Sequence, residues 1–182
     1  MANSAGGNFR SKSSDDIYAV LWSGGKDSCL ALWRALKSGL HIEGLVYFFD
    51  DASDRVRFHG VRSTLIAEQA RALDLELFQV GTKPDSFAAS FEATLHTIKA
   101  RGYTGLIAGD LHLEDVRTWN EERAAGAGLR LVEPLWHDDG ISLLRSLTEE
   151  GFRAVLTCCE EKWGNALWPA ARSITGLSMM YP

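Results

Sequence analysis

Short apolar runs alternate along this chain with segments whose apolar residues recur at helical spacing. The apolar runs cover residues 17–22, 44–49, 75–80, 105–108, 129–132 and 152–158. The helical segments cover residues 28–38, 63–73, 85–100, 113–125 and 141–150. The apolar runs lack polar alternation, which is typical of strands buried on both faces. This pattern predicts an α/β fold, with a parallel sheet covered by helices on both faces.

Length and composition favour a single globular domain. The chain has 182 residues, of which 46% are hydrophobic and 24% charged. We expect a polar leader over residues 1–16, a domain over residues 17–159 and a tail over residues 160–182.

Charge and cysteine content narrow the class of partner and compartment. Nineteen basic and 24 acidic side chains leave a net charge of -5, a poor balance for non-specific binding to nucleic acid or an anionic membrane. No apolar run approaches the roughly 18 residues of a membrane helix. The three cysteines, Cys29, Cys158 and Cys159, are odd in number and two are adjacent, which does not suit a disulfide framework. We therefore expect a soluble, cytoplasmic protein with free thiols.

The turn after the first apolar run carries the strongest chemical signal. Its residues are Ser23, Gly24, Gly25, Lys26, Asp27 and Ser28. Two glycines permit a tight turn and close backbone approach, and the following helix offers free N–H groups and its positive dipole end. Hydroxyl groups and a lysine complete a cradle suited to a polyphosphate. An ordinary glycine-rich turn before a capped helix is the alternative.

Two better-known phosphate loops do not fit this turn. A Walker loop needs glycine five residues before Gly25, and position 20 is valine. The dinucleotide fingerprint fails because its third glycine is missing.

The hexapeptide resembles the PP-loop of the ATP pyrophosphatase superfamily. Further segments are similar, in the same order, to the diphthine–ammonia ligase (diphthamide synthase) family. They are Phe-His-Gly-Val-Arg at 58–62, Gly-Asp-Leu at 109–111 with Arg117, Glu122 and Arg123, Glu-Pro-Leu-Trp at 133–136, and Arg-Ala-Val-Leu-Thr-Cys at 153–158.

This resemblance implies a Rossmann-like fold of the adenine nucleotide alpha hydrolase type and the use of ATP with Mg²⁺. It also implies an adenylate-forming ligase, in which a carboxylate is adenylated, pyrophosphate leaves, and ammonia displaces AMP to give an amide. The expected partners are ATP, ammonia and a carboxylate acceptor on a protein side chain or a small molecule. The resemblance leaves open whether the protein forms a homo-oligomer.

The resemblance also suggests roles for single residues. Lys26 would stabilise charge on the departing pyrophosphate. Asp27 and Asp110 would be catalytic and would hold Mg²⁺. Asp27 could equally complement the helix dipole, and Asp110 could equally cap the next helix.

Four further side chains are expected on the acceptor or phosphate side. They are His59, Arg62, Arg117 and Arg123. For Arg117, an ion pair with Glu121 one helical turn away is an equally good interpretation. Asp50 and Asp51, at a strand end, are expected to be solvated loop residues rather than ligands.

The sequence departs from the family after Cys159. The usual C-terminal motif is replaced by Glu-Glu-Lys-Trp-Gly-Asn at 160–165 and a different tail. The alternative to a ligase is therefore an ATP- or AMP-binding module without ligase chemistry. A truncated, unstable product is a third and weaker hypothesis.

Overall fold

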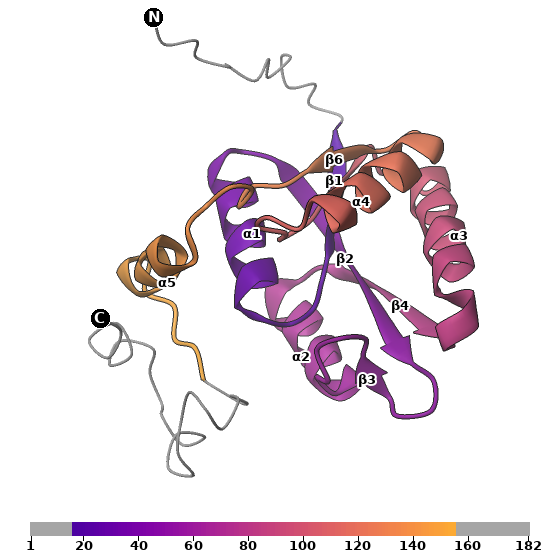
Figure 1. Cartoon of the computed structure of the whole chain (residues 1–182), viewed down its shortest axis with the longest axis horizontal. Helices are drawn as coiled ribbons and strands as arrows, with labels where there is room; N and C mark the ends of the chain where they lie inside the picture. The colour runs from indigo at the N-terminus through magenta and orange to yellow at the C-terminus, as the bar shows by residue number, and fades with distance from the viewer. Residues whose placement is uncertain (1–15, 156–182) are drawn as a thin grey trace, which may run out of the picture.

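The computed structural model describes residues 16–155 and contains a central sheet between two layers of helices (Figure 1). Its strands are β1 (Ile17–Leu21), β2 (His41–Asp50), β3 (Arg55–Val56), β4 (Glu76–Thr82), β5 (Gly105–Ile107) and β6 (Arg130–Val132). The helices are α1 (Lys26–Lys37), α2 (Ser63–Leu73), α3 (Phe87–Ala100), α4 (Glu114–Gly126) and α5 (Gly140–Glu149), and a 3₁₀ turn, η1 (Pro84–Ser86), precedes α3.

The order of the strands creates a switch point beside the predicted phosphate loop. The chain moves outward from β1 through β2 to β4, then crosses back to place β5 on the other side of β1 and β6 beyond it. All these pairings are parallel. Loops leaving β1 and β5 therefore diverge to opposite faces, and ligands of open α/β sheets bind in the resulting crevice.

Side chains of the central strands alternate between two cores. Tyr18 and Val20 pack with Leu30 of α1 and Ile66 of α2, whereas Ala19 faces the core formed by α3 and α4. Both faces of the sheet are thus buried, which explains the apolar runs without polar alternation. The predicted α/β class, with a mainly parallel sheet and helices on both faces, is confirmed.

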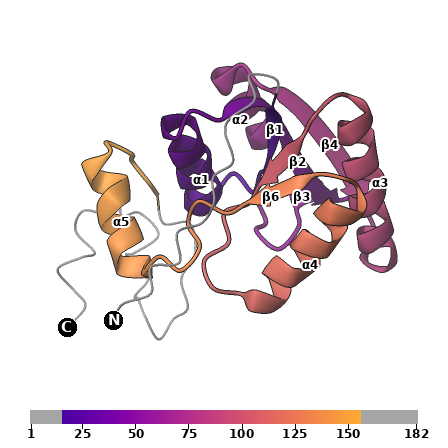
Figure 2. The same ribbon diagram turned by 90° about the horizontal axis from the view of Figure 1, so that it is seen from above.

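Helix α5 belongs to the side of the sheet that carries α1 (Figure 2). Leu143 and Leu147 are buried in the same core as Leu30. Just beyond the helix, Phe152 meets Trp33 edge-on at 5.9 Å between ring centroids. Among the described residues, α5 therefore packs beside α1 (Figure 2).

The mainly parallel sheet also contains one antiparallel pair, because β3 pairs with the end of β2. This two-residue strand is too short to produce a hydrophobic period. The expected strand at 152–158 is absent over residues 152–155, where Phe152 turns onto α1 instead.

Several sequence-based predictions lie outside the described residues. They concern the leader up to residue 15, Cys158, Cys159 and the tail at 160–182. Within residues 16–155, no helix is long and apolar enough to cross a membrane.

Candidate functional site

The turn between β1 and α1 leaves the first amides of the helix available to a ligand. Gly24 adopts φ +75°, a conformation that favours glycine. Gly25 occupies the N-cap position in extended geometry and supplies no capping side chain. The hydroxyl of Ser28 donates to the Gly25 carbonyl at 3.1 Å, and the Gly25 amide donates to Ser23 Oγ at 3.3 Å. The two serines therefore shape the turn, and the N–H groups of the first helical turn have no intrahelical partners, an arrangement suited to an anion.

Close packing holds this turn against its neighbours. A Cβ at Gly24 would lie 2.5 Å from Ile66 Cδ1 of α2, and one at Gly109 would lie 2.9 Å from the Asp27 carbonyl oxygen. From α2, Gln69 accepts a hydrogen bond from Trp22 Nε1 at 2.9 Å and donates to the Gly24 carbonyl at 3.3 Å. Because these contacts join β1, α2 and β5, the phosphate loop is positioned by tertiary structure as well as by its glycines.

Lys26 and Asp27 form an ion pair at the start of α1. Lys26 Nζ lies 2.7 Å from Asp27 Oδ2, and the two side chains are 42% and 35% exposed. A pair of this kind contributes little to stability. Lys26 is therefore available to exchange its carboxylate partner for a phosphate.

Asp110 lies across the switch point from α1. It leaves β5 and accepts a hydrogen bond from Asn120 Nδ2 of α4 at 3.1 Å. Burial raises the pKa of this carboxyl, with a smaller upward contribution from the negative charge of Asp27, while Asn120 and His59 oppose the increase. The interaction with Asp27 brings two predicted catalytic carboxylates into one electrostatic environment.

A cleft of about 800 Å³ opens at this edge of the sheet, a volume typical of small-molecule sites. Five predicted site residues line it: Ser23, Asp27, Ser28, His59 and Asp110. Its other walls are mostly apolar and aromatic, including Phe48, Phe58, Phe87, Phe91 and Trp119. The cleft thus has the turn that precedes α1 at one corner and an aromatic wall.

The remaining predicted side chains lie outside this lining. They are Lys26, Arg62, Arg117 and Arg123, together with the backbone of Gly24 and Gly25. Arg62 is the N-cap residue of α2. Arg123 lies over the Trp119 ring, 3.9 Å from its centroid, and pairs with Glu92. The structure therefore brings His59 to the cleft but not the three arginines.

Arg117 belongs to a cluster with Glu121, Glu133 and Trp136, beside the cleft lining. Its Nε lies 2.8 Å from Glu121 Oε1 and 3.1 Å from Glu133 Oε2, and its guanidinium stacks over Trp136. Only 5% of the Glu133 side chain is exposed, and Oε1 has no hydrogen-bond partner among the described residues. Burial raises the pKa of Glu133 to about 7, although Arg117 opposes the shift and Asp110 adds to it.

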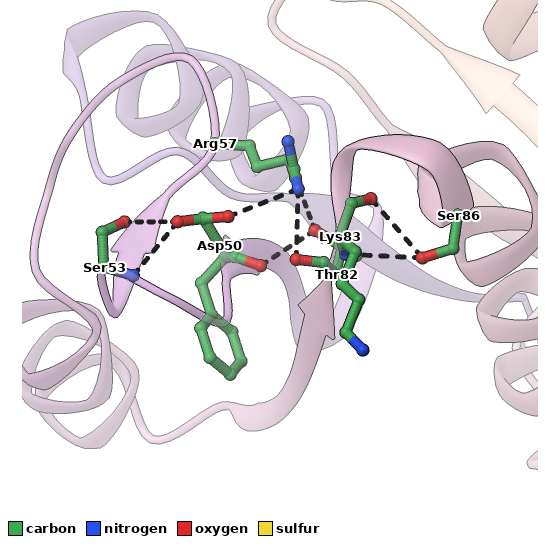
Figure 3. A network of polar contacts seen from close by, with 7 residues as sticks. Asp50, Ser53, Arg57, Thr82, Lys83 and Ser86 are labelled. Atoms are coloured by element: carbon green, nitrogen blue, oxygen red, sulfur yellow. Dashed lines mark hydrogen bonds and ion pairs between the residues drawn. The ribbon is translucent and has the colours of Figure 1, made fainter.

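A polar network fixes the segment that follows β2 (Figure 3). Arg57 Nε donates to Thr82 Oγ1 at 2.6 Å, and its terminal nitrogen donates to the Thr82 carbonyl at 3.1 Å. The same guanidinium lies 3.5 Å from Asp50 Oδ1. The other carboxylate oxygen of Asp50, Oδ2, accepts hydrogen bonds from the amide and the hydroxyl of Ser53. Asp50 is therefore a loop-ordering residue, and Arg57, which lines the cleft, connects the loop to the end of β4.

The described residues contain no group of three or more His, Cys, Asp or Glu side chains close enough to hold a metal alone. Asp27 and Asp110 nevertheless fit Mg²⁺, which binds proteins through one or two carboxylates and completes its shell with phosphate oxygens and water. The electrostatic interaction between their carboxylates is what a shared cation would relieve. Cys29 is unsuited to nucleophilic chemistry, because burial raises its pKa to about 11.

Sequence reasoning missed three residues that shape the site. Gly109 belongs to a segment that resembles the family, but its contact with α1 is visible only in the fold. Arg57 immediately precedes the family-like segment at 58–62 and could have been considered with it. Gln69 gave no signal, because a polar residue on a helix is ordinarily solvated.

A switch-point cleft with a Gly-Gly turn and an uncapped helix start defines this domain as a PP-loop ATP pyrophosphatase-like, nucleotide-binding domain. The family described as "Diphthamide synthase N-terminal domain" matches residues 17–131, more than half of the chain, and the chain belongs to this family. The search of curated proteins finds no match.

Solved structures resemble the fold at low sequence identity. A predicted subunit of tRNA methyltransferase from Methanocaldococcus jannaschii superposes with a TM-score of 0.53 at 18% identity, covering 80% of each chain. The U34-tRNA thiolase NcsA from Methanococcus maripaludis, solved with its [4Fe-4S] cluster, gives a TM-score of 0.48 at 12% identity, covering 82% of this chain and 63% of the other.

Proposed function

We propose that this protein is an ATP-dependent, adenylate-forming amide ligase of the diphthine–ammonia ligase type, acting in the cytoplasm. The observation that carries the proposal is the uncapped start of α1, which meets Asp110 across the switch point in the cleft. Free helix amides bind phosphate, and the adjacent carboxylates suit a metal-bound triphosphate.

The reaction consists of two displacements. An oxygen of the acceptor carboxylate attacks the α-phosphorus of ATP, and the bond to the β-phosphate breaks to release pyrophosphate. Ammonia then attacks the acyl carbon, AMP departs with the carboxylate oxygen, and one proton is released. The acceptor is a protein side chain or a small carboxylic acid.

The residues of the chain bind and orient the reactants rather than forming a covalent intermediate. Amides of the first turn of α1, with the hydroxyls of Ser23 and Ser28, would hold phosphate oxygens in place. Lys26 would leave Asp27 for the β- or γ-phosphate and stabilise the charge that develops on the leaving group. Asp27 and Asp110 would hold Mg²⁺, which supplies charge neutralisation of the triphosphate when bound.

Lys26→Met tests the proposed phosphate site, with Lys37→Met as the matched control. Lys37 lies at the opposite end of the same helix and pairs with Glu150 at 2.8 Å. By titration calorimetry with Mg²⁺ and ATP, we expect Lys26→Met to weaken binding about ten-fold or more, the equivalent of about 1.4 kcal/mol. Lys37→Met should bind like the unmodified chain; equal affinities in all three proteins would refute the role of Lys26.

The products of slow ATP hydrolysis test the reaction class without a known acceptor. With water in place of the acceptor, the proposed geometry predicts AMP and pyrophosphate, both lost in Lys26→Met. ADP and phosphate would contradict the proposal. ATP binding without AMP formation, even with ammonium and protein extract or small carboxylic acids added, would favour the nucleotide-binding module.

A further inference from the structure

Phe58 combines two features that folding alone does not explain. Its side chain is 86% exposed, the highest value among the large exposed hydrophobic residues of the described chain. Its backbone adopts φ +67°, a left-handed conformation that is a true outlier for a bulky residue. Strain of this kind persists where surrounding contacts impose it, and it concentrates at ligand clamps.

The contacts that impose this conformation are visible in the turn between β3 and α2. The Gly60 amide donates to the Val56 carbonyl at 2.9 Å, and the Val56 amide donates to the Val61 carbonyl at 2.7 Å. Arg57, the preceding residue, is held by Thr82 through its side chain. The turn is thus closed by its own hydrogen bonds and tied to β4, and Phe58 is held between these two anchors.

The exposed ring stands at the aromatic wall of the cleft. Phe58 and Phe87 meet edge-on at 5.9 Å and 84°, and Phe87 lies nearly parallel to Trp119 at 19°. All three rings line the cleft that contains Asp110. Within residues 16–155, the edge contact with Phe87 is the one ring contact of Phe58, and most of its ring is exposed.

We propose that Phe58 is an aromatic clamp that stacks on a planar aromatic ring of a ligand bound in the cleft. Stacking would cover the apolar ring, and the left-handed turn would hold it in place before the ligand arrives. The ring comes either from the adenine of ATP, in which case the inference rests on the proposed function, or from an aromatic acceptor. Stacking of a base on an aromatic side chain corresponds to a ten-fold or larger change in affinity.

Two substitutions separate aromaticity from apolar size. Phe58→Leu keeps an apolar side chain but removes the ring, and Phe58→Tyr keeps the ring. Ile141→Ala is the control, because Ile141 is also exposed but lies on α5, outside the cleft lining. Thermal melts of all four proteins establish that each is folded.

The first measurement compares ATP with inorganic tripolyphosphate, which carries the phosphates without a ring, by calorimetry at fixed Mg²⁺. If adenine is the stacked ring, Phe58→Leu weakens ATP binding about ten-fold and leaves tripolyphosphate binding unchanged. Phe58→Tyr and Ile141→Ala should both bind ATP like the unmodified chain.

The second measurement saturates the protein with α,β-methylene-ATP, which cannot be cleaved at the scissile bond, and adds phenylacetate or cyclohexylacetate. If the acceptor carries the ring, saturation-transfer NMR detects phenylacetate much more strongly than cyclohexylacetate. That signal should disappear in Phe58→Leu and persist in Phe58→Tyr and Ile141→Ala.

Two outcomes would overturn the clamp. In the first, Phe58→Leu changes neither ATP affinity nor the phenylacetate signal. In the second, cyclohexylacetate binds as well as phenylacetate and Phe58→Leu leaves ATP affinity unchanged.

Failure of the proposed function would give a different result. The unmodified chain would then bind neither ATP nor tripolyphosphate, and ring probes applied to the nucleotide-free protein would still test the clamp.

Discussion

At the scale of single residues, two glycines set the position of the phosphate loop through contacts that no side chain can replace. Gly24 needs its positive φ, which its sequence context already suggests. Glycine is required at position 109 for a different reason, because the loop after β5 contacts the backbone of Asp27 and Ser28 there. The first turn of α1 and the loop carrying Asp110 can approach each other only because position 109 has no Cβ.

Gly109→Ala should therefore impair both stability and nucleotide binding. The added Cβ would lie 2.9 Å from the Asp27 carbonyl oxygen and 3.2 Å from the Ser28 amide nitrogen. Backbone atoms must move to relieve this contact, at about 1–3 kcal/mol by analogy with overpacked cores. We expect urea unfolding to show this loss, and calorimetry to show ATP affinity reduced by about ten-fold or more.

Gly126→Ala provides the control for this substitution. Gly126 ends α4, and a Cβ added there would meet no described atom within 4 Å. Alanine in a helix is favoured over glycine by about 0.5–1 kcal/mol, so this variant should be as stable as the unmodified chain or slightly more stable. If the two alanine variants behave alike, the close contact at Gly109 does not matter.

At the scale of elements, the site depends on how the segment between β2 and α2 is tied down. The segment has little regular structure beyond the two residues of β3, so its shape depends on polar contacts. Arg57 supplies three of them, to Thr82 and Asp50 (Figure 3). This segment also carries Phe58 and His59, which line the cleft.

Arg57→Met should loosen this segment more than it weakens the whole fold. Methionine keeps most of the aliphatic stem but cannot donate to Thr82. We expect the unfolding free energy to fall by about 1.5–3 kcal/mol, since hydrogen bonds of charged groups contribute about that much. Amide exchange at His59 and Gly60 should accelerate by about ten-fold or more, because local opening becomes easier.

The control for Arg57→Met is Arg71→Met on α2. Arg71 makes an exposed i,i+3 ion pair with Glu68. Removing such a pair should change the free energy of unfolding by no more than about 0.5 kcal/mol. Unchanged exchange at Gly60 in Arg57→Met would show that the turn is held by its backbone bonds alone.

At the scale of the whole molecule, a buried carboxyl makes stability depend on pH. The raised pKa of Glu133, about 7, lies above its ordinary value near 4.5 because burial disfavours the charged form. Between these two values the folded chain retains a proton that the unfolded chain has released. The contribution of Glu133 to stability therefore falls as pH rises from about 4.5 to 7 and is constant above that range.

Glu133→Gln should remove this pH dependence. Glutamine resembles the protonated carboxyl, so the variant should match the unmodified chain near pH 4.5 and be more stable at pH 8, by up to about 3 kcal/mol. Urea unfolding at the two pH values measures the difference. Glu121→Gln is the control, because Glu121 contacts the same Arg117 but is about half exposed. A Glu133→Gln variant less stable at pH 8 would show that the Arg117 ion pair outweighs the cost of burial.

Much of the architecture could be predicted because it depends on local patterns. The predicted helix at 63–73 matches α2 to the residue, since its apolar spacing and the left-handed C-cap residue Asp74 are local features. The prediction of a strand at 152–158 is wrong over residues 152–155. An apolar run of that length also suits a segment that packs on a helix, as Phe152 does on Trp33.

The candidate site was only partly predictable for a related reason. Ser23, Asp27 and Asp110 follow strands, and strand ends of a parallel sheet meet at one edge, so their convergence could be inferred. Arg117 and Arg123 share α4 with Asn120, which lines the cleft. However, Arg117 pairs with Glu121 and Glu133, and Arg123, one turn beyond Asn120, stacks on Trp119, so that neither arginine is part of the cleft lining. Which face of α4 meets the cleft depends on the packing of that helix against the sheet.

The alternation of strands and helices, the Gly-Gly turn after β1 and the resemblance to the family could be inferred from the amino-acid sequence, because each is encoded in residues close together along the chain. The packed fold was needed to show that Gln69 and Gly109 position that turn, that Arg57 anchors the loop bearing Phe58, and that Glu133 is buried beside Arg117. These contacts join segments distant in sequence, and their energies depend on burial and distance, which arise only when the layers pack.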